Sequence, residues 1–190
     1  MKQILKTTGY LFLMLTIITA CQRQPSADFT TDKNSYTAGE TVKLTNTSVD
    51  ASKYKWTMPD GQTSSSENVD YTISENTPDG TLTFTLEAIS KNGNKSDEAV
   101  KTVSVEAAEG QLMVWTSNSN VNPISVYIDN VNMGTITLYY SGGTPDCGAN
   151  GCVTATLNVG TYSVYATDGN YTWNGALTVS ANQCSTFQLQ

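Results

Sequence analysis

The sequence predicts an all-β protein made of two consecutive small β-sandwich domains, and three observations lead to this prediction. From residue 27 onward, apolar residues recur at every second position in short runs, and turn-forming residues interrupt the runs about every ten positions, as in short strands. No part of this region has the apolar spacing of a helix, and the composition is rich in Thr, Ser, Asn, Tyr and Val. Residues 106–109 separate two strand-rich stretches, 27–105 and 110–190, each of which has the size of a small domain.

The first 20 residues have the layout of a secretory signal peptide. Two lysines supply positive charge, the stretch from Tyr10 to Ile18 is almost wholly apolar, and the small residue Ala20 stands where cleavage is expected. The apolar stretch is shorter than the roughly 20 residues that a bilayer-spanning helix needs. We therefore expect a cleaved signal at residues 1–20, followed by a short polar tether at residues 21–26.

The junction Ile18-Thr19-Ala20-Cys21 resembles the lipobox of bacterial lipoproteins. The resemblance implies cleavage before Cys21 and attachment of fatty acyl chains, such as palmitate, to this cysteine. Several acyl chains hold a protein stably on a membrane, because each buried CH₂ contributes about 0.8 kcal/mol. The residue after Cys21 is Gln22 and not Asp, which favours the outer membrane under the sorting rule of Gram-negative lipoproteins. The sequence does not determine whether the protein faces the periplasm or the outside.

The first domain contains five alternating apolar sets separated by two Pro-Asp-Gly turns, which indicates a sandwich. The sets are Val42 and Leu44; Tyr54, Trp56 and Met58; Val69, Tyr71 and Ile73; Leu82, Phe84, Leu86 and Ala88; and the run from Ala99 to Val105. Segments 27–29, 39–48, 54–61 and 80–86 resemble a PKD domain, although Trp-Thr-Met-Pro-Asp-Gly replaces the family's usual Trp-Asp-Phe-Gly-Asp-Gly. The resemblance implies an immunoglobulin-like sandwich at residues 27–105 that acts as a spacer or adhesive module and not as a catalyst.

The second domain, residues 110–190, resembles the PEGA-type, transthyretin-like β-sandwich modules of bacterial surface proteins. The similarity lies in the order of its strands and turns, at segments 125–136, 159–166 and 177–183. Residues 139–152 do not belong to that pattern. The resemblance implies a second β-sandwich.

The charge and the absence of histidine exclude several functions. Two of the ten basic residues lie in the predicted signal, so the mature chain would carry eight bases against 17 acids, a net charge of −9. Such a negative electrostatic field disfavours the binding of nucleic acid. Without histidine there is no His-based nucleophilic triad, general base or zinc site. We expect no metal and no cofactor.

Three cysteines follow Cys21, and in an oxidising compartment two of them should form a disulfide. The glycine-rich loop from Cys147 to Cys152 favours a local Cys147–Cys152 bond, and Cys152–Cys184, which would tie two strands, is the alternative. The remaining thiol is expected to be buried and inert.

Several aromatic residues lie out of phase with the predicted core. If Leu112, Ile124 and their alternating partners face inward, then Trp115, Tyr127 and Tyr165 lie on the outer faces. Tyr139, together with Tyr140, flanks the cysteine loop. These rings are candidates for an exposed platform that stacks on sugars or anchors a protein, unless the phase is reversed or another segment covers them. Trp56, by contrast, is predicted to be a core residue.

The sequence thus favours a non-catalytic lipoprotein of the bacterial cell envelope, anchored to the outer membrane through Cys21, that binds a glycan or a protein. The alternative is a structural spacer or an accessory subunit of an envelope complex, with no ligand of its own. Enzymatic activity is a third hypothesis without a supporting motif.

Overall fold

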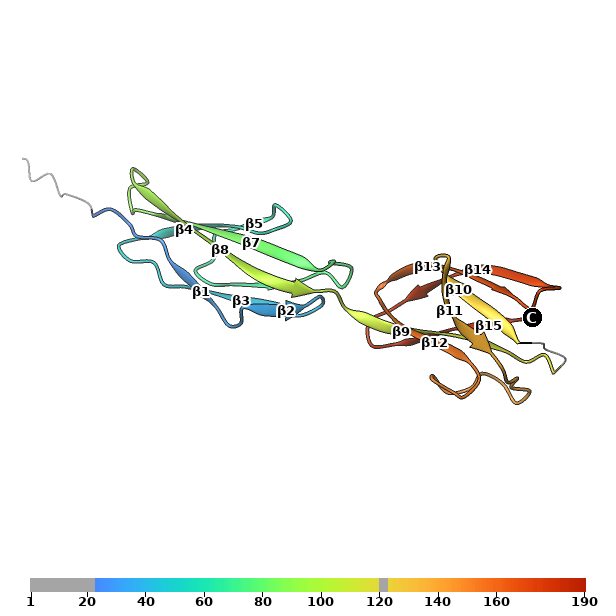
Figure 1. The fold of residues 1–190 in the computed structure, drawn as a ribbon. Helices are drawn as coiled ribbons and strands as arrows, with labels where there is room; N and C mark the ends of the chain where they lie inside the picture. The colour runs from blue at the N-terminus through green and yellow to red at the C-terminus, as the bar shows by residue number, and fades with distance from the viewer. Residues whose placement is uncertain (1–22, 120–122) are drawn as a thin grey trace, which may run out of the picture.

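The computed structural model describes residues 23–119 and 123–190, so the predicted signal peptide and Cys21 lie outside the described residues. These two stretches contain fifteen strands and no helix. The strands form two sandwiches that lie end to end (Figure 1). The prediction of an all-β fold with two consecutive β-sandwiches is confirmed. Within the described stretches, the structure has no helix with the length and hydropathy to cross a bilayer.

The first sandwich packs a three-stranded sheet, β1-β3-β6, against a five-stranded sheet, β2-β8-β7-β4-β5. Its strands are β1 (Phe29–Thr31), β2 (Ser35–Thr37), β3 (Thr41–Asn46), β4 (Lys53–Thr57), β5 (Thr63–Ser64), β6 (Val69–Thr72), β7 (Gly80–Ile89) and β8 (Ser96–Glu106). The pair β7–β8 is a long antiparallel hairpin, whereas β2 pairs with β8 in parallel.

The predicted inward residues of the first sandwich form its core. Phe29, Trp56 and Phe84 are fully buried, and Phe29 meets Trp56 edge to face with ring centroids 5.1 Å apart. The indole N–H of Trp56 donates to the backbone carbonyl of Ser66 at 2.9 Å, so the one polar atom of this ring is satisfied. The prediction that Trp56 is a core residue is confirmed.

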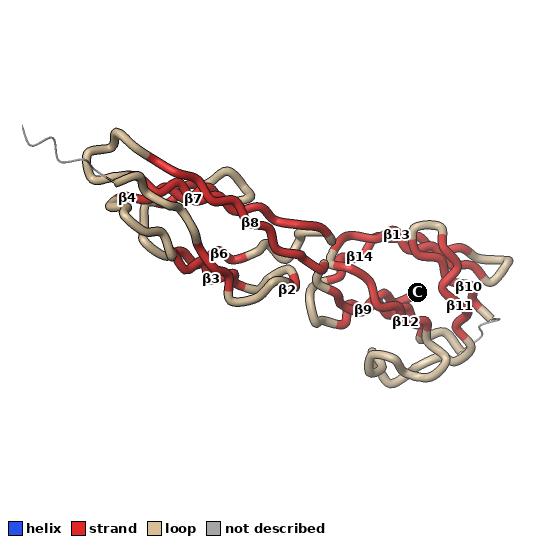
Figure 2. Tube along the Cα trace, turned by 60° about the vertical axis from the view of Figure 1, so that its left-hand side comes forward, coloured by secondary structure: helices blue, strands red, loops and turns tan. Residues whose placement is uncertain are grey.

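The second sandwich packs a four-stranded sheet, β11-β10-β13-β14, against a three-stranded sheet, β12-β9-β15, in which β9 and β15 are parallel. Its strands are β9 (Glu109–Thr116), β10 (Ile124–Ile128), β11 (Val131–Ile136), β12 (Val153–Asn158), β13 (Gly160–Thr167), β14 (Thr172–Val179) and β15 (Cys184–Leu189). Alternate residues of each strand enter a shared apolar core, as the spacing of two predicts. Figure 2 shows the long loop between β11 and β12, residues 137–152, beside this second sandwich.

The connection between the sandwiches is short and held in place. Only Ala107 and Ala108 lie between β8 and β9. The carbonyl of Ala108 accepts a hydrogen bond from the N–H of Val159 at 2.7 Å, and the N–H of Ala107 donates to the carboxylate of Asp79 at 2.7 Å. Ala108 is buried in the first core, against Val159 of the second sandwich. These bonds restrict bending between the sandwiches.

Candidate functional site

Two tyrosines lie side by side on the outer face of the four-stranded sheet. Tyr127 of β10 and Tyr165 of β13 are direct register partners, so both rings lie on the same face. Their ring centroids are 5.6 Å apart, with the planes tilted by 46°. Tyr165 is 36% exposed and Tyr127 is half-buried. The sequence prediction that these two residues face outward is confirmed.

The alternation of buried residues produces this arrangement. The neighbours of the two tyrosines along the strands point into the core and are at most 3% exposed: Val126, Ile128, Val164 and Ala166. A tight turn at Asp129 and Asn130, both with positive φ, returns the chain from β10 into β11. A bulge after Val126 then shifts the register, so that Asn132 of β11 stands opposite Tyr127.

The tyrosines form the centre of a row that crosses all four strands. Asn132 of β11 is the partner of Tyr127, and Asn174 of β14 is the partner of Tyr165. The order across the sheet is therefore Asn132, Tyr127, Tyr165 and Asn174, and we call these four residues the tyrosine row. The surrounding residues on this face are small and mostly hydroxylic: Ser125, Thr135, Thr161, Ser163, Thr167, Thr172, Ala176 and Thr178.

An acidic group, Asp129, follows Tyr127 by two residues and is hydrogen-bonded to Ser163 on the same face. One oxygen of its carboxylate accepts hydrogen bonds from the N–H and the hydroxyl of Ser163, at 2.8 and 2.7 Å. The hydroxyl and the amide of Ser163 hold the pKa of Asp129 below its ordinary value of 3.8, so this group is ionised at neutral pH. The carboxylate is therefore a hydrogen-bond acceptor on the same face as Ser163.

Trp115 does not belong to the exposed platform, and that part of the prediction is wrong. Trp115 is only 3% exposed, and Met113, on the same outer face of β9, is fully buried. The phase of β9 is as expected, because Leu112 and Val114 face the core. The prediction of exposure is wrong because another segment lies over this outer face of β9.

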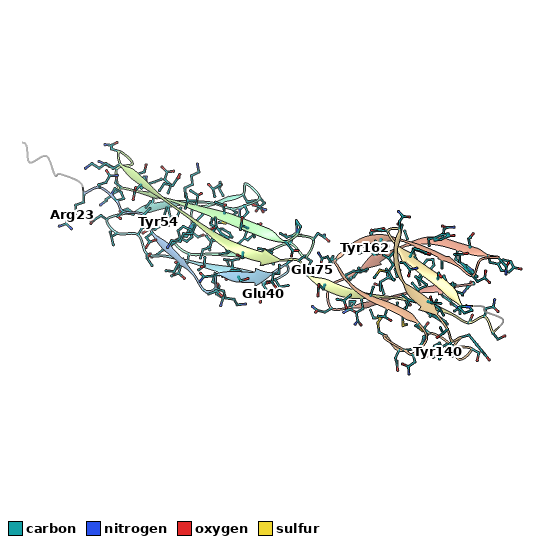
Figure 3. All side chains as sticks on the ribbon, viewed as in Figure 1. Arg23, Glu40, Tyr54, Glu75, Tyr140 and Tyr162 are labelled. Carbon is teal, nitrogen blue, oxygen red and sulfur yellow. A yellow bond between two sulfur atoms is a disulfide. The ribbon has the colours of Figure 1, made fainter. Side chains whose placement is uncertain are left out.

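Loop 137–152 is tied to the three-stranded sheet at two places, which indicates that it lies over this outer face. The N–H of Tyr140 donates to the carbonyl of Thr116 at 2.9 Å, and a disulfide joins Cys147 to Cys184 at the start of β15. Tyr140, which is labelled in Figure 3, donates its hydroxyl to the carbonyl of Asn150 at 2.6 Å, and this bond closes the loop on itself. The loop is thus fixed near both ends of β9, at Thr116 and beside Gln111. The indole N–H of Trp115 is buried there without a hydrogen-bond partner.

Tyr139 is exposed, at 48%, but it lies in this loop. The loop is tied to the three-stranded sheet, and the tyrosine row lies on the other sheet. The structure therefore does not bring Tyr139 together with Tyr127 and Tyr165.

Both predicted disulfide pairings are wrong, because the bond joins Cys147 to Cys184, with the Cα atoms 6.2 Å apart. Cys152 directly precedes β12, which is separated from β15 by β9. Two strand spacings amount to about 9–10 Å, beyond the roughly 7 Å that a disulfide can bridge between Cα atoms. Cys152 is also held at the sheet, since the next residue, Val153, pairs with β9, whereas Cys147 lies in the exposed part of the loop.

Cys152 is the free cysteine among the described residues. Its side chain is half-buried, and burial raises the pKa of the thiol above its ordinary value of 9.0. A protonated thiol is a poor nucleophile and a poor metal ligand. In the part of the chain that the structure describes, no three Cys, Asp or Glu side chains are placed to hold a metal ion.

No model of a known protein family matches the chain. No curated protein matches it. Among solved structures, the chain is similar to the PKD1 domain of Vibrio anguillarum Epp, with 24% identity, a TM-score of 0.37, and coverage of 45% of this chain and 98% of that one. It is similar to the PKD1 domain of the Vibrio cholerae metalloprotease PrtV, with 27% identity, a TM-score of 0.36, and coverage of 45% and 100%. It is also similar to a carbohydrate-binding module of the β-sandwich superfamily, with 15% identity, a TM-score of 0.41, and coverage of 76% and 55%.

Proposed function

We propose that this protein is a non-catalytic, lipid-anchored module of the bacterial cell envelope that binds a glycan or a protein through the tyrosine row. The observation that carries the proposal is the contact between Tyr127 and Tyr165 on an open sheet face, with an asparagine on either side. Exposed aromatic rings that are already in contact lose little conformational freedom when a ligand stacks on them.

The chemistry around the row supports binding and not catalysis. General acid–base catalysis needs a group whose pKa lies near the working pH, and covalent catalysis needs an activated nucleophile. Asp129, the acid two residues beyond Tyr127, has a lowered pKa and is hydrogen-bonded to Ser163. The other groups on this face are amides, hydroxyls and phenols, which suit recognition.

The N-terminal end of the first sandwich supports the proposed anchor. The side-chain amide of Gln24 donates to the carbonyl of Ser96 at 2.7 Å, and Ser26 pairs with Val49. The chain is therefore fixed to the first sandwich three residues after Cys21. A lipid on Cys21 would hold this end against the bilayer, and the second sandwich, at the opposite end of the molecule, would project away from it (Figure 1). That geometry suits the display of a binding face in the envelope, with the outer membrane as the proposed location.

The short connection at Ala107 and Ala108 favours a second candidate, a structural spacer or accessory subunit without a ligand of its own. The bond from Val159 to Ala108 gives the molecule a stiff, elongated form that suits a spacer. The two candidates differ in whether the tyrosine row binds a ligand.

Binding of the soluble chain beginning at Gln22 to isolated cell envelopes separates the two candidates. We expect the variant Tyr127→Ala/Tyr165→Ala to lose at least about tenfold in affinity, because both rings of the contact are removed. Tyr139→Ala is the matched control, since this tyrosine is exposed but lies on the loop of the other sheet. Equal binding by all three proteins, at equal melting temperatures, would support the spacer and eliminate the binding face.

The anchor is tested by metabolic labelling with radioactive palmitate and by membrane fractionation. We expect Cys21→Ser to abolish labelling and to release the protein from the membrane fraction. Cys152→Ser, which changes a half-buried internal thiol, should leave both unchanged. A Cys21→Ser protein that is still labelled and sedimented would overturn the anchor.

A further inference from the structure

We infer that the ligand of the tyrosine row is a neutral glycan that lies across the strands, from Asn132 to Asn174. This inference rests on the proposed function and adds the chemical class and the orientation of the ligand. Three features of the second sandwich carry it: the length of the row, the distribution of charge, and the lack of aliphatic side chains around the two rings.

The row is an extended, narrow strip with stacking groups in the middle and hydrogen-bonding groups at both ends. Four adjacent strands place its ends about 14 Å apart, from three spacings of about 4.8 Å each. A short oligosaccharide covers such a length. Sugar rings present C–H groups that stack on aromatic faces, and their hydroxyls suit the amides of Asn132 and Asn174 at the ends. The 46° tilt between Tyr127 and Tyr165 fits successive sugar rings that turn relative to one another.

The charge of the second sandwich excludes an anionic ligand. No lysine, arginine or histidine occurs after Lys101 in the sequence, so every basic residue of the described chain lies in the first sandwich or in the tether before it. An anionic glycan would lose its hydration at the row without a cation to compensate. It would also meet the ionised carboxylate of Asp129 at the edge. A neutral sugar, in contrast, can donate its hydroxyl hydrogens to the second oxygen of Asp129.

The same face is a poor match for a protein partner. Protein interfaces of standard size have an apolar core in which aromatic residues, Met and Arg are enriched. Among the described neighbours of the two rings on this face, one residue, Ala176, has an aliphatic side chain. The other neighbours are serine, threonine and asparagine residues. Such a surface offers hydrogen bonds to a hydroxyl-rich ligand and little area for an apolar anchor.

Affinity electrophoresis with paired polysaccharides tests the inference on the soluble chain beginning at Gln22. Hydroxyethylcellulose and dextran are the neutral probes, and carboxymethylcellulose and dextran sulfate are their anionic counterparts. We expect a neutral probe to retard the protein, and each of Tyr127→Ala and Tyr165→Ala to weaken that retardation at least about fivefold. Tyr139→Ala should migrate like the parent. A glycan array then extends the same comparison to neutral and acidic oligosaccharides with other linkages.

Asn174→Lys gives the sharpest variant, because it places one cation beside Tyr165 without removing either ring. We expect this variant to gain retardation by the anionic probes. Stronger binding of the parent to the anionic members, or the absence of neutral glycan binding in both the gels and the array, would overturn the inference. If no glycan binds but Tyr127→Ala/Tyr165→Ala still loses binding to cell envelopes, the proposed function stands and its ligand is a protein. If that double variant binds envelopes like the parent, the proposed function itself falls.

Discussion

Cys147 is bonded to Cys184 across 37 positions of sequence, and this bond fastens loop 137–152 to the sheet that carries Trp115. The aromatic side chains of the second sandwich are therefore divided between two faces. The loop covers Trp115, while Tyr127 and Tyr165 lie open on the opposite sheet. A loop outside the regular strand pattern thus accounts for the different exposure of these aromatic side chains.

Removal of this disulfide should expose the covered face. In Cys147→Ser/Cys184→Ser, we expect the second sandwich to lose about 3–4 kcal/mol of stability, because the unfolded chain is no longer cross-linked. Peptides spanning 111–116 and 137–152 should exchange amide hydrogens faster in hydrogen–deuterium exchange mass spectrometry. Cys152→Ser is the control and should exchange like the parent. Unchanged protection of residues 137–152 in the double variant would show that the disulfide is not what holds the loop on the sheet.

Gly110 should be intolerant of any side chain. A Cβ atom at this position would overlap the backbone carbonyl of Ser180 and would lie 3.0 Å from that of Gln183. Both carbonyls belong to the turn between β14 and β15, which cannot withdraw without breaking the bond from the N–H of Gln111 to Gln183. We expect Gly110→Ala to destabilise the second sandwich by about 1–3 kcal/mol in urea unfolding. Gly80→Ala, where a Cβ atom meets nothing within 4 Å, should stay within about 0.5 kcal/mol of the parent.

Asp32 should make the first sandwich sensitive to acid. Its carboxylate accepts hydrogen bonds from the N–H of Lys43 and the hydroxyl of Tyr36, both at 2.8 Å, and these bonds lower the pKa of Asp32 below its ordinary value of 3.8. Because the folded state holds the charged form, the stabilisation is complete above pH 3.8 and disappears as the pH falls through the lower folded value. We expect the melting temperature of the first sandwich to fall below about pH 4.

Tyr36→Phe tests this effect, because it removes one donor to Asp32 and keeps the ring in the core, although it also removes the acceptor of the Lys33 N–H. The carboxyl pKa of Asp32, followed by NMR, should then move up towards 3.8, and the acid dependence of the melting temperature should become weaker. Identical titration curves in the two proteins would contradict the role of the Tyr36 hydroxyl.

Trp56 should contribute more to stability than any exposed residue of its sheet. Trp56→Ala would leave a cavity beside Phe29 and an unpaired carbonyl at Ser66, so we expect a loss of about 3–5 kcal/mol from the first sandwich. The measurement is urea unfolding monitored by circular dichroism. Val100→Ala, at a residue of β8 that is 55% exposed, should stay close to the parent. A loss below about 1 kcal/mol for Trp56→Ala would mean that the core closes around the missing ring.

The strand pattern of the sequence predicted the face on which each side chain lies with good accuracy. Trp56, Phe84, Leu112 and Val126 are all buried as their alternation requires, and Tyr127 and Tyr165 point outward. This accuracy has a local cause, since successive residues of a strand must point to opposite sides of the sheet. The phase of Trp115 was also correct, and only its exposure was not.

The sequence by itself thus determined the β class, the two-sandwich fold and the inward or outward direction of the alternating side chains in its predicted strands. The tertiary structure alone decided which strands are neighbours, and with them three outcomes: the contact between Tyr127 and Tyr165, the cover over Trp115, and the bond from Cys147 to Cys184. The physical reason is one of range. Side-chain direction follows from the backbone of a single strand, whereas strand order depends on how two whole sheets close over a common core.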